Sequence, residues 1–219
     1  MKKGLYAMLV FLWCGTGCSQ NPLPSNLKPL NIDFKNRGYF YASCEQIEQT
    51  AGLGGWADSG NMYQKIDRPG RFEQRKLIIA VDTSEPAAFA EKYLGHTLYV
   101  ANTLFHTIFF DAQDSRLEMK LQALDKNGEW KDIEYLPSSW CGNSYHMVYL
   151  PGHHYWKFTV PAYEGKFKTR LRAVLSYKTA TESGERLAYS NEFEGSVNDG
   201  QFTKLPNYKP GGIMDPYNN

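Results

Sequence analysis

The sequence has almost no excess of charge of either sign and no long hydrophobic segment at its N-terminus. Its formal net charge at pH 7 is +1, from 24 basic and 23 acidic residues among 219. This balance gives no electrostatic case for nucleic-acid binding and no polybasic membrane-binding segment. The apolar run Leu5–Trp13 has nine residues, whereas a helix needs about 20 to cross a bilayer. The run is therefore too short for a transmembrane helix.

The sequence also lacks the short motifs that mark common catalytic and metal centres. It contains no Gly-x-Ser-x-Gly nucleophile elbow. The adjacent His153 and His154 have no glutamate at the spacing of a zinc protease. Residues 125–128 (Asp-Lys-Asn-Gly) begin like a calcium loop but lack its later ligands. We predict no catalytic residue, no bound metal, no cofactor and no enzymatic activity.

The N-terminus has the three parts of an export signal. Lys2 and Lys3 precede the apolar run, and the small residues 15–17 (Gly-Thr-Gly) follow it, directly before Cys18. A charged start, a short apolar stretch and a small-residue site are typical of a cleaved signal. The small residues and the cysteine resemble the lipobox of bacterial lipoproteins, although Gly15 stands where that family usually has an aliphatic residue.

This resemblance implies a signal peptide over residues 1–17 and lipidation of Cys18. Cys14 lacks the approach of small residues and is the poorer candidate. Because Ser19 is not the aspartate that retains many lipoproteins at the inner membrane, the family pattern favours the outer membrane. Several acyl chains on one cysteine would anchor the protein stably. An ordinary cleaved signal with a secreted product is the alternative.

Cleavage before Cys18 would leave 202 residues and, with Lys2 and Lys3 removed, a net charge of −1. Residues 18–40 begin with a polar, proline-containing stretch without periodicity and predict a tether. Cys44 and Cys141 would then be the two unassigned cysteines. In an oxidising compartment such a pair predicts a disulfide, which would contribute about 4–5 kcal/mol on chain-entropy grounds. The alternative is two thiols buried separately.

From residue 76 onward the hydrophobic period is two. Short β-branched or aromatic runs bounded by turn residues predict about nine strands, over residues 76–81, 97–103, 106–110, 116–124, 129–136, 145–150, 155–160, 167–177 and 186–193. Asn127-Gly128 supplies the positive-φ positions of a hairpin turn. The segment Pro86–Tyr93 predicts one short helix between strands. One apolar face per strand, such as Trp156, Phe158 and Val160, is the antiparallel pattern.

Residues 150–161 and 171–193 resemble a Pro-Gly turn with its strand and the closing hairpin of immunoglobulin-like modules. Residues 76–203 are also similar to uncharacterised bacterial envelope lipoproteins that share Ser-Trp-Cys-Gly-Asn-Ser-Tyr and Tyr-Ser-Asn-Glu-Phe-Glu-Gly. These resemblances imply an all-β, immunoglobulin-like antiparallel β-sandwich in the cell envelope, without a particular activity. The predicted order is a signal at 1–17, a tether at 18–40, a loop-rich segment packed on the sandwich at 41–75, the sandwich at 76–203 and a tail at 204–219.

One stretch concentrates cysteine, histidine and methionine in the manner of a copper site. Cys141 and His146 have a plausible gap for the ligand loop of blue-copper sandwiches, with His96 or His106 as the remaining ligand. Met147 directly follows His146, so on a strand it would face the other way and could not be the axial ligand. We keep copper binding as an alternative and favour the disulfide for Cys141.

Two further features could bind a glycan. Trp56 lies in a glycine-rich loop and could stack on a sugar ring, or it could fold onto the sandwich. A basic stripe faces away from the predicted core and consists of Lys166, Lys168, Arg170 and Arg172. The stripe could meet an anionic glycan, or it could be a solvated face paired with acids such as Asp132 and Glu134.

Together these observations predict a lipid-anchored cell-envelope protein with a structural or binding role and no catalysis. Its expected partners are the membrane, through the lipid, and a glycan or an envelope protein; nucleic acid is not expected. A glycan-binding surface lipoprotein and a copper-binding sandwich are the alternatives.

Overall fold

A computed structural model describes residues 23–47, 59–68, 70–139, 142–179 and 182–206. Most of these residues lie in strands that pair in sheets, as the period-two pattern predicts. The prediction of an all-β sandwich is therefore confirmed. In the described part of the chain, no helix is long and apolar enough to cross a bilayer.

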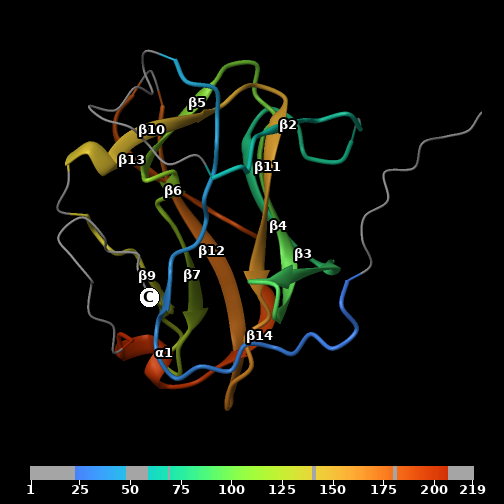
Figure 1. Ribbon diagram of the computed structural model, residues 1–219, viewed down its shortest axis with the longest axis vertical. Helices are drawn as coiled ribbons and strands as arrows, with labels where there is room; N and C mark the ends of the chain where they lie inside the picture. Colours follow the sequence, from blue (N-terminus) through green and yellow to red (C-terminus); the bar gives the residue numbers. More distant parts are fainter. Residues whose placement is uncertain (1–22, 48–58, 69, 140–141, 180–181, 207–219) are drawn as a thin grey trace, which may run out of the picture.

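The smaller layer is a four-stranded antiparallel sheet in the order β2-β11-β4-β3. Its strands are β2 (Gln64–Lys65), β11 (His154–Pro161), β4 (Tyr93–Asn102) and β3 (Leu77–Phe89). In Figure 1 this sheet is on the right, with β11 and β4 side by side.

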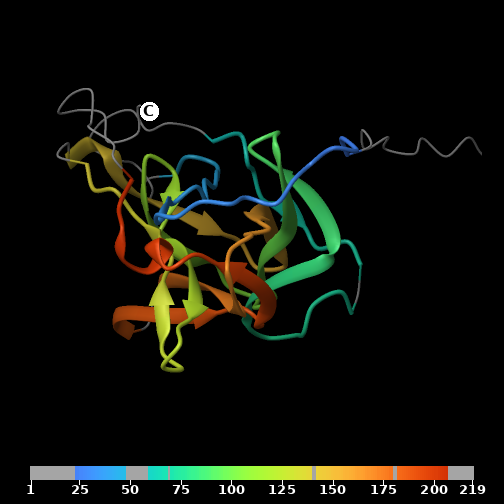
Figure 2. The same cartoon turned by 90° about the horizontal axis from the view of Figure 1, so that it is seen from below.

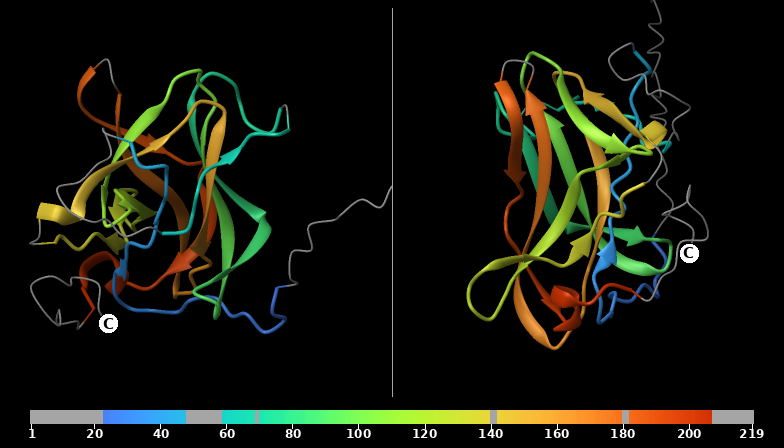
Figure 3. Two further views of the ribbon diagram at one scale, coloured as in Figure 1. Left: turned by 45° about the horizontal axis from the view of Figure 1, so that its top comes forward. Right: turned by 90° about the vertical axis from the view of Figure 1, so that its left-hand side faces the viewer.

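The larger layer is an eight-stranded sheet organised around the 13-residue strand β12. Its strands are β5 (Ile108–Gln113), β6 (Arg116–Leu117), β7 (Met119–Leu124), β8 (Trp130–Asp132), β10 (Tyr145–Leu150), β12 (Phe167–Thr179), β13 (Glu182–Tyr189) and β14 (Phe193–Val197). Strand β12 pairs with β7, with β14 near its start and with β13 near its end. The right-hand view of Figure 3 shows β12 and β13 as neighbouring orange and red strands.

The core lies between the two sheets. Trp156 is fully buried, and its ring packs edge-on against Phe110 of the larger sheet, with centroids 5.5 Å apart. Phe158 and Val160 are buried with it, so the predicted inward face of β11 is confirmed. Tyr155, on the opposite face, is also buried, because the loop between β2 and β3 lays Phe72 over it at a centroid distance of 5.9 Å. Part of the face expected to be solvated is therefore covered.

The prediction of a helix over Pro86–Tyr93 is wrong. Pro86 to Phe89 extend β3 and pair in register with His96 to Tyr93 of β4. Ala90 and Glu91 both have positive φ, at 48° and 60°, which closes a tight hairpin turn. Strand pairing thus overrides the helical preference of an alanine-rich segment. The α-helix that the structure describes is the four-residue α1 (Gly200–Thr203).

The last predicted strand, residues 186–193, divides into β13 and β14. Between them, Asn191 leaves the larger sheet and binds the backbone of β3. Its Oδ1 accepts from Val81 N at 2.8 Å and its Nδ2 donates to Val81 O at 3.0 Å. This side chain joins the two layers at the point where the sequence suggests one continuous strand.

The predicted tether over residues 18–40 is wrong from Lys28 onward. Leu30 is buried and forms a parallel bridge with Tyr163. Further on, β1 (Asn36–Arg37) pairs in parallel with β9 (Glu134–Tyr135). In Figure 1 this blue segment runs along the base and then rises past β9.

The same segment supplies part of the core. Phe40 is fully buried, and its ring lies edge-on to Phe158 at 5.7 Å. Beyond it, the backbone carbonyl of Ser43 accepts a hydrogen bond from Trp156 Nε1 at 2.9 Å. Leu30, Ile32 and Phe34 alternate with polar residues here, but the burial of Phe40 depends on the sheets that it meets and is not apparent from the sequence. We call residues 28–47 the N-terminal strap.

Replacement of Phe40 by alanine tests the role of the N-terminal strap. Loss of a fully buried phenylalanine costs about 3–5 kcal/mol of unfolding free energy, measured by chemical denaturation. Phe34→Ala is the matched control, because Phe34 belongs to the same strap but is 38% exposed, and it should cost about 1 kcal/mol or less. Equal destabilisation by the two variants would contradict the position of Phe40 in the core.

Candidate functional site

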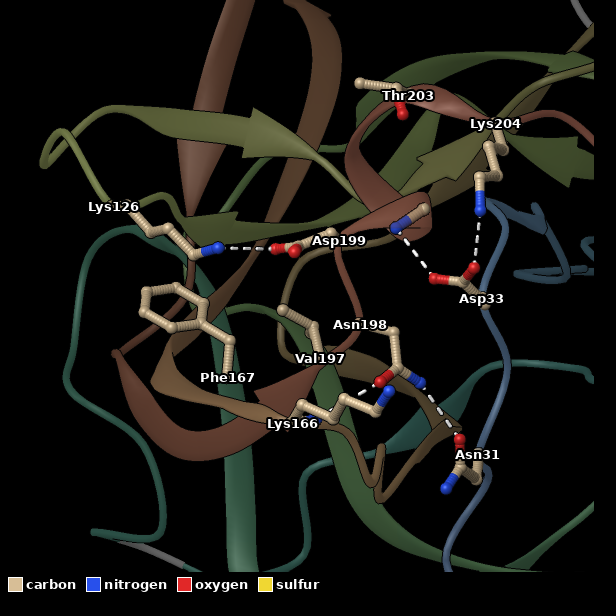
Figure 4. Close-up of a pocket in the computed structure, with 11 residues that line it drawn as sticks. Asn31, Asp33, Lys126, Lys166, Phe167, Val197, Asn198, Asp199, Thr203 and Lys204 are labelled. Atoms are coloured by element: carbon tan, nitrogen blue, oxygen red, sulfur yellow. Dashed lines mark hydrogen bonds and ion pairs between the residues drawn. The ribbon is translucent and has the colours of Figure 1, made fainter.

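A pocket of about 630 Å³ lies at the base of the molecule, where the strap, the β7–β8 hairpin, the start of β12 and α1 meet (Figure 4). From below, α1 lies beside the blue strap (Figure 2). The charged residues of the lining are Lys126, Lys166, Lys204, Asp33 and Asp199. They come from four separate parts of the chain, so the site exists only in the folded protein.

The hairpin turn places Lys126 at one side of the pocket. Asp125 Oδ1 accepts from the backbone N–H of Asn127 at 2.8 Å and of Glu129 at 2.9 Å, and Gly128 has a φ of 78°. The predicted hairpin is therefore confirmed, with positive φ at Gly128 but not at Asn127. The ammonium group of Lys126 lies 2.9 Å from Asp199 Oδ1 and 5.7 Å from the centre of the Phe167 ring.

Asp33 joins the strap to α1 at the other side. Its Oδ1 accepts from Gly200 N at 2.8 Å, and its Oδ2 lies 2.5 Å from the ammonium group of Lys204. The Lys204 and Gly200 hydrogen bonds hold the pKa of Asp33 below its ordinary value. A side chain at Gly200 would put a Cβ 2.0 Å from Asp33 O, so the contact requires glycine.

The wall between these two ion pairs is fixed by Asn198. Its Nδ2 donates to Asn31 Oδ1 and to Ile32 O, each at 2.9 Å. Its Oδ1 accepts from Lys166 N at 3.2 Å, and its own N–H donates to Gln201 Oε1 at 2.9 Å. The backbone at Lys166 is therefore held in place beside the pocket (Figure 4).

The electrostatic feature of the pocket is an excess of lysine. Both aspartates are within ion-pair distance of a lysine, Lys126 or Lys204. The ammonium group of Lys166 has no ion-pair partner among the described residues, and it acts on Asp33 only as a weaker, more distant charge. Three lysines against two aspartates leave a formal charge of +1. Such a lining can receive a carboxylate, phosphate or sulfate group.

The four residues of the basic stripe have different surroundings. Lys166 lines the pocket, and Lys168 is exposed. Arg170 forms an ion pair with Glu192 at 2.5 Å. Arg172 is half-buried on the outer face of the larger sheet, farther along β12. The stripe is therefore not one charged patch.

The expected pairing of the stripe with Asp132 and Glu134 is also wrong. Asp132 pairs with Lys120 of the neighbouring strand at 2.5 Å and accepts from Gln122 Nε2 at 2.9 Å. Glu134 is only 1% exposed and lies in the interior. The chain bends between β8 and β9, so that Ile133 and Glu134 are both buried. Strict alternation would have exposed one of the two.

Glu134 is the buried ionisable group that sequence reasoning missed. Its Oε1 accepts from the hydroxyl groups of Tyr39 at 2.8 Å and Tyr163 at 2.9 Å, and its Oε2 accepts from Leu121 N at 2.9 Å. Burial raises the pKa of its carboxyl group to about 7, despite these three hydrogen bonds. No local signal reveals the site, since its donors come from distant parts of the chain.

The residues of the copper alternative have other contacts. His146 is buried; its Nε2 accepts from Ser115 N at 3.3 Å, and its Nδ1 lies 3.2 Å from Ser144 O. Burial lowers the pKa of its ring. Within the described ranges, no three His, Cys, Asp or Glu side chains, including those of His96 and His106, group as metal ligands. The geometry therefore gives the copper alternative no support at His146.

Three predicted site residues lie outside the described residues: Cys18, Trp56 and Cys141. Lipidation, sugar stacking and the disulfide therefore stay predictions. Cys44, the expected partner of Cys141, is buried at 5% exposure beside the core. No protein-family model, curated protein or solved structure matches this chain.

The raised pKa of Glu134 predicts a pH-dependent stability. The pKa of Glu134 is about 7 in the folded protein, against an ordinary value of 4.5. Between pH 4.5 and 7 the folded state therefore binds a proton that the unfolded state has lost. The free energy of unfolding should therefore fall as the pH rises from about 4.5 to 7, by about 3 kcal/mol. Glu134→Gln should remove this part of the slope, measured by urea denaturation at several pH values.

An NH₂ group cannot accept the hydrogen bond from Leu121 N, so Glu134→Gln can change the free energy of unfolding for a reason other than titration. The quantity to compare is therefore the slope of the free energy of unfolding with pH, and not its value at one pH. Glu192→Gln is the control, since it makes the same exchange at an exposed ion pair, and it should retain the wild-type slope. The same slope in wild type and Glu134→Gln would show that Glu134 does not titrate in this range.

Proposed function

We propose that the protein is a lipid-anchored module of the cell envelope that binds an anionic group without catalysis. The lysine-rich pocket carries the proposal, because Lys126, Lys166 and Lys204 converge there with only Asp33 and Asp199 to neutralise them. The chemical class of ligand is a carboxylate, phosphate or sulfate, such as an acidic envelope glycan presents. The lipobox resemblance at Cys18 supports a location in the cell envelope and favours the outer membrane.

A purely structural role in the envelope is the second candidate. The ion pair of Asp33 with Lys204 and its hydrogen bond with Gly200 attach the strap to α1. These contacts would serve a structural protein equally well. The charge of Lys166 distinguishes the two functions, since an ammonium group without an ion-pair partner adds nothing to the attachment.

Lipid anchoring predicts that Cys18→Ser is released from the membrane. Wild type should fractionate with membranes and carry the mass of acyl chains on its N-terminal cysteine, measured by intact-mass spectrometry after detergent extraction. Cys18→Ser should lack that mass and appear in the soluble fraction, because more than one chain is needed for stable anchoring. Cys14→Ser is the matched control and should behave as wild type. Release of Cys14→Ser instead of Cys18→Ser would move the lipid to Cys14.

The pocket predicts salt-sensitive binding of a polyanion. Dextran sulfate should bind wild type and uncharged dextran should not, measured by isothermal titration calorimetry at two salt concentrations. The double variant Lys126→Gln/Lys166→Gln should bind about tenfold more weakly, because each lost charge at a partly exposed site is worth about 0.2–1 kcal/mol. Lys168→Gln is the control, since Lys168 is exposed and lies outside the pocket lining. Unchanged binding by the double variant would favour the structural role.

A further inference from the structure

Arg172 is held between two aromatic rings on the outer face of the larger sheet. Its guanidinium carbon lies 4.2 Å from the ring centre of Trp130 on β8 and 4.2 Å from that of Tyr189 on β13. Its Nε donates to Gln122 Oε1 at 3.0 Å. A guanidinium group stacks well on aromatic faces. Two rings and one hydrogen bond therefore fix the orientation of this side chain.

The terminal nitrogens of Arg172 remain available. In the described part of the chain, neither η nitrogen has a hydrogen-bond acceptor, and no carboxylate lies within ion-pair distance. The nearby acids are engaged elsewhere, since Asp132 pairs with Lys120 and Glu192 pairs with Arg170. Gln122 donates to Asp132 and accepts from Arg172, so it is fixed as well. The result is a pre-oriented fork of N–H donors, the geometry that binds a carboxylate through two parallel hydrogen bonds.

A groove adjoins this fork and shares Gln122 with it. The groove has a volume of about 210 Å³. Its lining combines acidic, hydroxyl and apolar groups, among them Glu118, Glu185, Ser176 and Leu187, with one basic residue, Lys120, which pairs with Asp132. Leu187 is 54% exposed and Tyr189 is 46% exposed, so the β13 side of the groove offers apolar surface to a ligand.

These features favour a ligand with a carboxylate at one end and hydroxyl groups at the other. The carboxylate would accept from the η nitrogens of Arg172, because Glu118 and Glu185 would repel it inside the groove and Lys120 is already paired with Asp132. Hydroxyl groups would donate to Glu118 and Glu185, and the ring could lie against Tyr189. The volume is below the 300–1,000 Å³ of sites for drug-sized ligands, so it suits a single ring.

We propose that Arg172, clamped by Trp130 and Tyr189, forms with the adjoining groove a binding site for a carboxylated sugar of the uronate type. The site is separate from the lysine-rich pocket: none of the groove residues lines that pocket. The proposal goes beyond the proposed function by adding a second site and naming a sugar class, and it does not need the pocket to bind.

Methyl glucuronide is the probe, with methyl glucoside and N-acetylglycine as comparisons that lack the carboxylate and the sugar ring, respectively. Titrations of the ¹⁵N-labelled protein are followed by NMR, through the side-chain Nε–H signal of Arg172. Wild type should bind the glucuronide with a Kd of the order of 1 mM, and the other two compounds at least tenfold more weakly. Binding should shift the Arg172 signal, because the η nitrogens gain an acceptor.

Arg172→Lys keeps the charge but loses the planar fork, so it should weaken glucuronide binding at least tenfold. Tyr189→Leu should weaken it several-fold without any change of charge. Arg170→Lys is the matched control: it makes the same exchange two residues earlier on the same strand, where Glu192 already occupies the side chain. It should bind as wild type does. Backbone spectra establish that each variant is folded.

Equal glucuronide binding by wild type and Arg172→Lys would overturn the assignment of the fork, and no binding by wild type would overturn the site. Equal binding of the glucoside would show that the carboxylate is not recognised. Equal binding of N-acetylglycine would replace the sugar by a simple carboxylate, such as a peptide C-terminus. Loss of dextran sulfate binding in the pocket variants leaves these outcomes unchanged, so the two proposals can fail separately.

Discussion

The buried carboxyl group of Glu134 is the contact on which the arrangement of the strap and the sheets depends. An isolated carboxylate in the interior is very costly unless hydrogen bonds satisfy it. Here the donors are Tyr39 from the strap, Leu121 from β7 and Tyr163 from the segment after β11. The strap therefore cannot leave without exposing a buried acid that has lost one of its donors. Desolvation still dominates, as the raised pKa of Glu134 indicates.

The strap links this buried contact to the lysine-rich pocket. Phe40 fills part of the core, and Asp33 attaches the strap to α1. A segment whose only strand is the two-residue β1 thus completes both the core and the pocket. It also limits the reach of the proposed anchor. Only nine residues separate Cys18 from Lys28, the first residue of the strap, so an acylated Cys18 could lie no more than about 35 Å from the fold.

The sequence predicts the sheets well because strand formation here depends on a local period. Each of the nine predicted runs lies largely within strands, and Trp156 faces the core as alternation requires. The failures come from pairing and packing that the local period does not encode. Pro86–Phe89 becomes a strand because β4 pairs with it. The strap is buried because the two sheets leave a place for Phe40. Glu134 is buried because three distant donors meet at one point.

The candidate sites are even harder to predict from the local sequence pattern than the fold. Alternation correctly places the basic residues on one face of β12, but the neighbouring strands decide what each of them does. Arg170 meets an acid, whereas Arg172 meets two aromatic rings and an amide. Neither Trp130 nor Tyr189 is close to Arg172 in sequence, so no sequence motif predicts that their rings enclose its guanidinium group. The pocket is equally non-local, since Asp33 and Lys204 lie at opposite ends of the described chain.

Strand β12 sets the relation between the two proposed sites. Arg172 is six positions after Lys166, which at about 3.3 Å per residue is about 20 Å of backbone. A ligand with a single anionic group can therefore reach only one of them at a time. Pairing with β7, β13 and β14 fixes this distance, because β12 is held on both edges. A small carboxylate would therefore report on the Arg172 site and a long polyanion on the lysine-rich pocket. A substitution at one site need not change the affinity at the other.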